Sequence, residues 1–246
     1  MKLLTLNLWD GRLLQQALNL LAKEKPDIVC LQEVWSSDEI VRIPADIFNS
    51  LDSVSSAIGL PHVFFSPTIK SSVHSTNTGF GNAILSNTPF ESTETVFIHG
   101  KLQDRYSSLT HTSNTRNLQK CTINVGDKKL TIFNHHAYWD ENPEGNEVSK
   151  ACMQKVSDEI QKCSGPTILA GDLNVWPKSP AMRVFDGKLR DLTADYGLNS
   201  TLSQLGKVDN VACDHILTSE AVHVSTFSAS EELVSDHKAL MLEFEI

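Results

Sequence analysis

The chain has 246 residues, with 21 Lys and Arg against 30 Asp and Glu, so its formal net charge is −9. Its apolar content of 40% and charged content of 21% exclude a chain that is disordered by composition. The acidic excess excludes a protein that coats nucleic acid through bulk positive charge, but not one that handles a phosphate at a local site. No apolar run is long enough for a membrane span, and the first residues lack a signal-peptide cleavage pattern, so we expect a cytoplasmic protein.

Short apolar runs alternate with polar segments from the first residues onward. Leu3–Leu8 alternates and predicts a strand. Leu13–Lys25 has apolar residues at helical spacing and stops at a proline, which predicts a helix. Ile28–Leu31 is a short apolar run typical of a buried strand. Ser36 and Glu39 fit a capping box, which predicts a second helix.

The remainder of the chain predicts many strands and one long helix. The helix runs from Val148 to Cys163. The predicted strands are His62–Phe65, Ala83–Ser86, Thr95–Ile98, Cys121–Val125, Leu130–Asn134, Thr167–Ala170, Val211–Leu217, Val222–Phe227 and Leu240–Phe244. Gly126-Asp127 makes two of them a hairpin, and the polar segments 66–82 and 100–119 are expected to be loops. This mixture favours two sheets packed together with helices outside, rather than one doubly wound parallel sheet.

Polar side chains that suit a metal or a phosphate stand at the ends of several predicted strands. Each alone has an ordinary explanation as a turn or a helix-start residue. Together they indicate convergence at one edge of the sheets, because rigid strand ends can hold several side chains toward one point. The positions are Asn7, Gln32-Glu33, His135-His136, Asp172 with Asn174, Asp214, and Ser235-Asp236-His237.

Seven stretches, in order along the chain, carry a resemblance to a known family. They are TLNLW (5–9), PDIVCLQEV (26–34), GFGNAILSN (79–87), TIFNHHAYW (131–139), ILAGDLNVWP (168–177), CDHILTS (213–219) and SDHKALMLEFEI (235–246). The sequence resembles the endonuclease/exonuclease/phosphatase superfamily, which has the DNase I-like fold. The resemblance implies a single catalytic domain over residues 1–246, a four-layer α/β/β/α sandwich with two mixed β-sheets face to face, and metal-dependent hydrolysis of phosphoester bonds.

The donor types suit a hard divalent cation, since Mg²⁺ prefers carboxylate and amide oxygens. We expect Glu33 to be the first ligand, with Asn7 beside it, and Mg²⁺ to be the cofactor, with Mn²⁺ as the alternative. Asp214 and Asp236 are expected to serve this metal ion or a second one.

Hydrolysis also needs an in-line water and charge neutralisation on the phosphoryl oxygens. Asp172 is expected to orient or deprotonate the water, and Asn174 to donate to a phosphoryl oxygen. His237 is expected to act as a protonated donor whose ring Asp236 fixes. His136 is expected to be a second donor or a general acid, and alternation along the strand puts either it or His135 on the catalytic face.

Two further positions, Asn82 and Arg116, lie where the resemblance implies contacts to the substrate phosphate, and an arginine suits a bidentate contact. Departures from the family bear on the substrate. Trp9 and Ala212 replace an acid and an arginine that abasic-site endonucleases of the superfamily carry, which weakens a repair assignment. Trp139 and Trp176 are expected near the rim of the site, where an aromatic ring stacks on a base or faces a lipid, or else packs beneath the rim.

The sequence therefore predicts a phosphodiesterase, with nuclease as the largest single class of activity. The alternatives are a phosphatase or a sphingomyelinase-like phospholipase C-type enzyme, and a binding module that has lost catalysis. The expected partner is a phosphoester substrate, nucleic acid or small molecule, and the protein is expected to be a monomer. The five widely spaced cysteines are expected to be free thiols.

Overall fold

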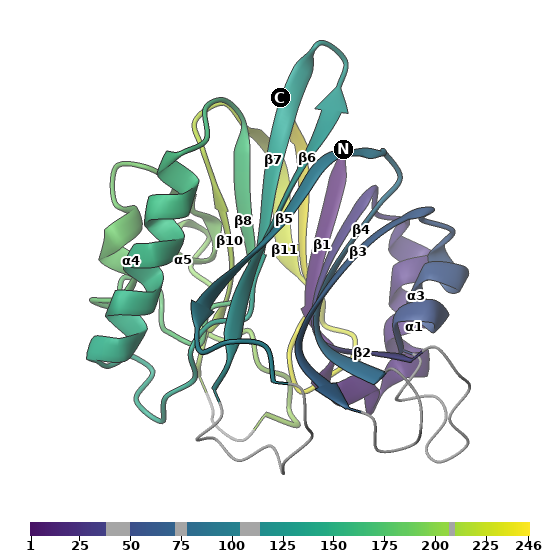
Figure 1. Cartoon of the computed structure of the whole chain (residues 1–246), viewed down its shortest axis with the longest axis horizontal. Coiled ribbons are helices and arrows are strands. Elements are labelled where there is room, and N and C mark those ends of the chain that lie inside the picture. The colour runs from purple at the N-terminus through teal and green to yellow at the C-terminus, as the bar shows by residue number, and fades with distance from the viewer. Residues whose placement is uncertain (38–49, 72–77, 104–113, 207–209) are drawn as a thin grey trace.

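The computed structural model describes residues 1–37, 50–71, 78–103, 114–206 and 210–246, and two sheets of six strands each dominate it. Figure 1 shows the sheets face to face, with α1 and α3 outside one sheet and α4 and α5 outside the other. The helices are α1 (Leu14–Glu24), α3 (Ser50–Ile58), α4 (Glu147–Gln161) and α5 (Leu192–Asp195), with the short 3₁₀ turns η1 (Trp9–Gly11) and η3 (Met182–Phe185).

The first sheet combines both ends of the chain. Its strand order is β11-β12-β1-β2-β4-β3. The bounds are β1 (Lys2–Asn7), β2 (Ile28–Ser37), β3 (His62–Ser71), β4 (Thr78–Ser86), β11 (His223–Ala229) and β12 (Leu240–Glu245). β1 runs parallel to β2 and antiparallel to β12, so the sheet is mixed.

The second sheet is built from the middle of the chain, in the order β5-β6-β7-β8-β10-β9. Its strands are β5 (Phe90–His99), β6 (Arg116–Val125), β7 (Lys128–His135), β8 (Thr167–Asp172), β9 (Arg190–Asp191) and β10 (Asp214–Thr218). β7 and β8 are parallel and the other pairs are antiparallel. The predicted hairpin at Gly126-Asp127 is confirmed as the connection between β6 and β7.

Alternation along the strands sorts apolar side chains into three buried layers. On β1, Leu3 belongs to the core between the sheets, while Leu4 and Leu6 pack beneath the helices of the first sheet. On β7, Ile132 faces the core between the sheets, and Phe133 packs with side chains of α4. Because successive side chains on a strand point to opposite faces, each sheet buries both of its surfaces. The predicted four-layer sandwich is confirmed.

Three local predictions were wrong or incomplete. Residues 66–71 and 78–82, expected in a loop, belong to β3 and β4, and residues 116–119 belong to β6. Ser36 lies in β2 rather than at the start of a helix, and Glu39 lies outside the described residues. Strand β10 begins at Asp214, three residues later than the alternation indicated.

Polar side chains inside these strands explain the loop error, because they hydrogen-bond within the sandwich instead of meeting water. Asn134 of β7 accepts from Gln32 Nε2 of β2 at 2.7 Å and donates to Gln119 Oε1 of β6 at 2.9 Å. Asn117 of β6 accepts from Asn82 of β4 at 3.0 Å and donates to the Ser66 carbonyl of β3 at 3.0 Å. These amides join the two sheets directly beside the strand ends that carry the site.

No helix within the described ranges is both long and apolar enough to cross a lipid bilayer. All five cysteines are free, as predicted, and all but the half-buried Cys163 are buried.

Candidate active site

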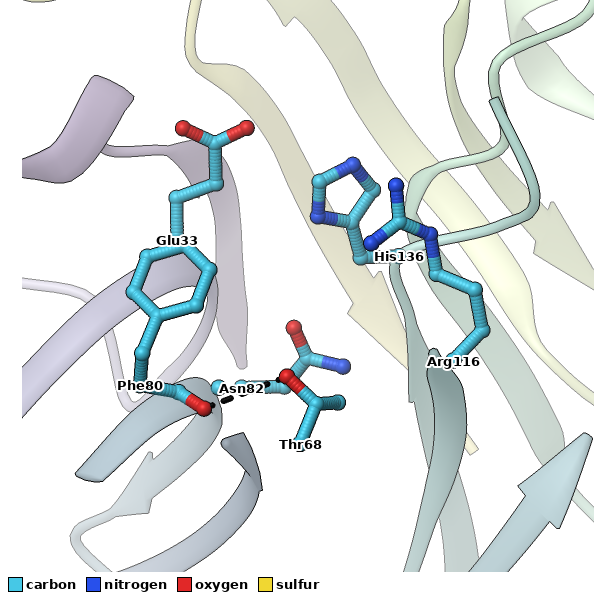
Figure 2. A pocket seen from close by; sticks show the side chains of 7 residues that line it. Glu33, Thr68, Phe80, Asn82, Arg116 and His136 are labelled. Atoms are coloured by element: carbon cyan, nitrogen blue, oxygen red, sulfur yellow. Dashed lines mark hydrogen bonds between the residues drawn. The ribbon is translucent and has the colours of Figure 1, made fainter. Parts of the chain in front are cut away.

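Strand ends from both sheets surround a cleft of about 560 Å³. The predicted site residues that line it are Glu33, Arg116, His136, Asp172, Asn174, Asp236 and His237. A hollow of about 10 Å³ shares several of these lining residues and is bounded by Glu33, Asn82, Arg116 and His136, among others. Figure 2 shows Glu33 on one side of this hollow, with His136 and Arg116 on the other.

Glu33 is directed into the cleft by an irregular point in β2. The pairing with β4 shifts register between Leu31 and Val34, and Glu33 has a φ of 56°. Residues other than glycine rarely adopt such a value, which marks local backbone strain typical of functional positions. Burial, and then the nearby charge of Asp10, raise the pKa of Glu33 to about 7.

Asn7 connects Glu33 to the opposite sheet. Its Nδ2 donates to Glu33 Oε1 at 3.2 Å and to Asp172 Oδ2 at 3.1 Å. Its Oδ1 accepts from the backbone N–H of Trp9 at 3.0 Å. The amide nitrogen therefore faces the two carboxylates, and the predicted role of Asn7 as an oxygen ligand requires its amide group to turn over. In the present arrangement Asn7 positions both acids.

Two more acids share the cleft with Glu33, and the donor set fits a hard cation. Asp10 and Asp236 both line the cleft, and burial raises the pKa of each. Glu33 also feels the negative charge of Asp10 and Asp172. Buried carboxylates of like charge that raise one another's pKa are stabilised by a divalent cation. Since all of these donors are oxygens, they suit Mg²⁺ or Mn²⁺.

Asp172 is the central acid of the opposite wall, and it is almost fully buried. Its Oδ1 accepts from the backbone N–H of Asn174 at 3.0 Å, which holds the turn after β8. Asn174 has a φ of 55°, and its Nδ2 donates to the Ala137 carbonyl at 3.1 Å. Burial raises the pKa of Asp172 to about 6, against the opposing effect of His237. Asp172 is thus an anion at neutral pH that retains considerable basicity.

His237 is held by Asp214, and not by Asp236 as predicted. His237 Nδ1 lies 2.9 Å from Asp214 Oδ2, whereas its Nε2 lies 4.0 Å from Asp236 Oδ1. The prediction that Asp236 fixes the ring was wrong, because Asp236 faces the cleft. Asp214 is buried behind the ring, outside the residues that line the cleft, and Thr201 donates to its Oδ2 at 2.6 Å. This position does not suit the metal-ligand role expected of Asp214.

The charge of His237 follows from these neighbours. Burial lowers its pKa, but the carboxylates of Asp214 and Asp172 outweigh burial and hold the pKa well above the ordinary value. His237 Nε2 lies 3.8 Å from Asp172 Oδ2. An imidazolium therefore faces the cleft at neutral pH, next to the acid that would activate a water.

The two adjacent histidines are separated as the alternation of β7 requires. His136 lines the cleft, with Nε2 at 3.5 Å from Asp172 Oδ2. His135 is fully buried, and its Nδ1 lies 2.8 Å from the Asn117 carbonyl. Burial, followed by the positive charge of Arg116, holds the pKa of His136 well below the ordinary value. A neutral His136 suits hydrogen bonding to a phosphoryl oxygen better than proton donation as a general acid.

Arg116 begins β6 and lies beside His136 in Figure 2. Its Nε donates to the Ala137 carbonyl at 2.6 Å, the same oxygen that Asn174 contacts. Burial lowers its pKa, while Glu33 and Asp172 act in the opposite direction. Asn82 lines the hollow, although its Nδ2 is used by Asn117. Both predicted phosphate-binding residues therefore reach the site. Arg116 lines both the cleft and the hollow, whereas Asn82 lines only the hollow.

Aromatic and aliphatic side chains form part of the cleft wall. Trp9, Phe80, Trp139, Leu202 and Val211 belong to it. Trp176, predicted at the rim, is 39% exposed but does not line the cleft. The cleft is thus polar where the acids and histidines meet and apolar at its sides.

Sequence reasoning missed two contributors to the site, Thr201 and Cys213, and expected a third, Asp10, only at the rim. Asp10 follows Trp9 in a turn with positive φ at both residues, and it supplies an acid one position later than the family pattern implies. Thr201 supports Asp214 from a distant segment, and no sequence signal indicates that contact. Cys213, set aside as an ordinary buried thiol, lines the cleft next to His237.

Comparison with known proteins identifies the family. The model of the Endonuclease/Exonuclease/phosphatase family matches residues 4–237. The chain belongs to this family. A curated relative, the putative neutral sphingomyelinase of Drosophila melanogaster, is 25% identical over all of this chain and 61% of its own length. The chain thus spans less than two thirds of that relative.

Solved structures share the fold at low identity. An endonuclease/exonuclease/phosphatase from Beutenbergia cavernae has a TM-score of 0.75 and 19% identity, covering all of this chain and 71% of that one. D. rerio TDP2 complexed with a single-strand DNA product has a TM-score of 0.71 and 16% identity, covering 100% and 99%. A mannosyl-6-phosphatase from Bacteroides thetaiotaomicron has a TM-score of 0.70 and 16% identity, covering both chains completely.

Proposed function

We propose that this family member is a Mg²⁺-dependent phosphodiesterase. The observation that carries the proposal is the pairing, across one cleft, of an imidazolium on His237 with the basic carboxylate of Asp172, opposite the acids around Glu33. A cation of this kind, bound at Glu33, would supply Lewis-acid neutralisation of the phosphoryl charge.

The residues of this chain divide the remaining work. Asp172 accepts the proton of a water that attacks phosphorus in line, and it is poised to do so because its pKa of about 6 lies just below neutral pH. His237 and Arg116 donate hydrogen bonds to the phosphoryl oxygens, whose negative charge grows as the new P–O bond forms. Neutral His136 and Asn174 orient the phosphate. As the P–O bond to the leaving group breaks, the leaving oxygen takes a proton from solvent.

The experiment is hydrolysis of bis-p-nitrophenyl phosphate by the purified chain. We expect Mg²⁺ or Mn²⁺ to support turnover and EDTA to abolish it. His237→Ala removes the charged donor and should lower kcat by a factor of about 10²–10³. His223→Ala, an exposed histidine on β11, is the matched control and should keep full turnover. Unchanged turnover in His237→Ala would refute the proposal.

Two observations favour a second candidate, a phospholipase C-type activity on a lipid phosphodiester. The Drosophila relative is named as a sphingomyelinase, and the cleft has an apolar wall that includes Trp9 and Trp139. A nuclease activity is instead supported by the similarity to TDP2, whose structure contains a single-strand DNA product. Parallel assays with sphingomyelin micelles, single-stranded DNA and p-nitrophenyl phosphate separate a lipase, a nuclease and a phosphatase.

We also infer a cytoplasmic monomer from the sequence, in keeping with the five free thiols. Size-exclusion chromatography with light scattering tests the monomer, and fractionation of the source cells tests the location.

A further inference from the structure

Three side chains that could hold a metal ion meet in the cleft, and two of them, His237 and Asp172, also belong to the proposed phosphate site. Cys213, His237 and Asp172 each offer one donor atom, and the three atoms lie within 4.8 Å of one another. All three residues line the cleft, although Asp172 and Cys213 are almost fully buried. The set holds sulfur, nitrogen and oxygen donors, whereas the acids around Glu33 offer oxygen alone.

One donor atom from each residue lies within 4.8 Å of the other two. Asp214 holds His237 Nδ1, so Nε2 is the nitrogen left for an ion, and it lies 3.8 Å from Asp172 Oδ2. Cys213 Sγ lies 4.0 Å from Nδ1 of the same ring. A tetrahedral zinc site with ordinary bond lengths places its donors about 3.4–3.8 Å apart. The Cys213 side chain would therefore have to move about 1 Å toward Nε2 to complete the set.

The sulfur decides which cation this set takes. Thiolate is a soft ligand that selects Zn²⁺ or Cd²⁺ and is a poor partner for Mg²⁺. In the structure Cys213 Sγ makes only long contacts, at 3.6 Å to Asp214 Oδ2 and 3.8 Å to Thr201 Oγ1. These are weak hydrogen bonds, which a bond from sulfur to a metal ion readily replaces.

We propose that Cys213, His237 and Asp172 form an inhibitory site for a thiophilic divalent cation, Zn²⁺ or Cd²⁺, separate from the Mg²⁺ site at Glu33. The inhibitory role rests on the proposed function, because the cation occupies the ring of His237 and the carboxylate of Asp172. Binding releases the thiol proton of Cys213 and a proton of the imidazolium to solvent. The charged donor and the base for the water are then lost together, and excess Mg²⁺ does not restore them.

Cadmium titration of the full chain without substrate tests the site directly. We expect one equivalent of Cd²⁺ to produce an ultraviolet thiolate-to-cadmium charge-transfer band that persists in excess Mg²⁺. Cys213→Ser should weaken this binding by at least about tenfold, the loss that even indirect ligand support causes. Cys163→Ser is the matched control, because Cys163 is a half-buried thiol just past the C-terminus of α4, and its Sγ donates a long hydrogen bond, 3.8 Å, to the Glu159 carbonyl. An unchanged band in Cys213→Ser overturns the proposal.

Cadmium-113 NMR of the unmodified protein keeps the test independent of any variant's folding. A resonance shifted by one sulfur ligand supports the site, and one at the position of all-oxygen coordination overturns it.

Inhibition assays distinguish the site from the proposed function. Cd²⁺ should inhibit hydrolysis of bis-p-nitrophenyl phosphate in excess Mg²⁺, and Cys213→Ser should raise the inhibitory concentration at least about tenfold. Equal inhibition of both proteins overturns the proposal. If the charge-transfer band depends on Cys213 but the protein has no hydrolase activity, the cation site is supported. The proposed function and the inhibitory role are then refuted.

Discussion

Glu33 shows how a single residue can be suited to a site and unfavourable for the fold. Its backbone has positive φ, and burial together with Asp10 raises its pKa to about 7 from a usual 4.5. A carboxyl group with a raised folded-state pKa binds its proton more tightly in the folded chain than in the unfolded chain. The folded state therefore loses stability from this group as pH rises from about 4.5 to 7, and the full penalty applies above that window.

Glu33→Gln should remove this penalty in the metal-free protein. A shift of this size corresponds to at most about 3 kcal/mol, and solvent at the cleft reduces it. We expect the variant, in EDTA, to melt about 3–8 °C above the native chain at pH 8 and much closer to it at pH 5. Thermal unfolding followed by circular dichroism at both pH values measures this.

The exposed Glu220→Gln is the control for loss of a surface charge and should leave the melting temperature unchanged at both pH values. A Glu33→Gln variant that is less stable at pH 8 than the native chain contradicts the account. The same variant should lose Mg²⁺-dependent hydrolysis, so that one substitution raises stability and removes activity.

The location of several site residues was predictable from sequence. Glu33, Asp172 and His237 stand out by residue type and by their position at strand ends, and the structure brings them to one cleft. The partner of His237 was not predictable in this way, because Asp236 is adjacent in sequence while Asp214 is adjacent in space. Only the packing of β10 against the last loop decides between two aspartates of equal chemistry.

At the scale of elements, alternation was a good guide wherever one face of a strand is apolar. It failed at β6 and β3, where Asn117, Gln119 and Ser66 are buried yet polar. These side chains satisfy one another across the sheets, and a sequence pattern does not distinguish a buried amide with partners from a solvated one.

The parallel pair β7 and β8 depends on a close approach at Gly171. A Cβ at this position would lie 2.1 Å from the His135 carbonyl oxygen, and the φ of Gly171 is 140°. No side chain fits at that distance without moving the backbone of β8, which carries Asp172, or of β7, whose end is followed directly by His136. Gly171 therefore fixes the spacing between two residues of the site.

Gly171→Ala should separate these strands and destabilise the chain by several kcal/mol, about 3 or more, through overpacking and backbone strain. Gly187→Ala is the matched control: its φ is 70°, but nothing lies within 4 Å of the added Cβ, so its cost should be about 1 kcal/mol. Urea unfolding of the two variants measures the difference. Equal costs would show that backbone conformation alone, and not the contact with β7, governs Gly171.

On the scale of the whole molecule, the net charge of −9 disfavours an extended nucleic-acid substrate, whereas the site can bind a single phosphate. Arg116 and His237 supply positive charge at one point of the cleft, but the chain as a whole carries nine more acidic than basic residues. A protein that grips duplex DNA neutralises several phosphates, and its affinity then falls steeply with salt. A cleft that neutralises one phosphate releases few counterions.

We therefore expect weak binding of long nucleic acid and little dependence on salt. For single-stranded or duplex DNA, the slope of log Kobs against log salt should be smaller in magnitude than about 2, because each neutralised phosphate contributes about 0.7–0.9. Fluorescence anisotropy between 50 and 200 mM NaCl, roughly the range over which such slopes are resolved, measures this. Hydrolysis of bis-p-nitrophenyl phosphate over the same range should change little. A slope of about 5 or more would mean that an extended basic surface engages DNA, and the substrate would then be a polymer rather than a single phosphodiester held by its one phosphate.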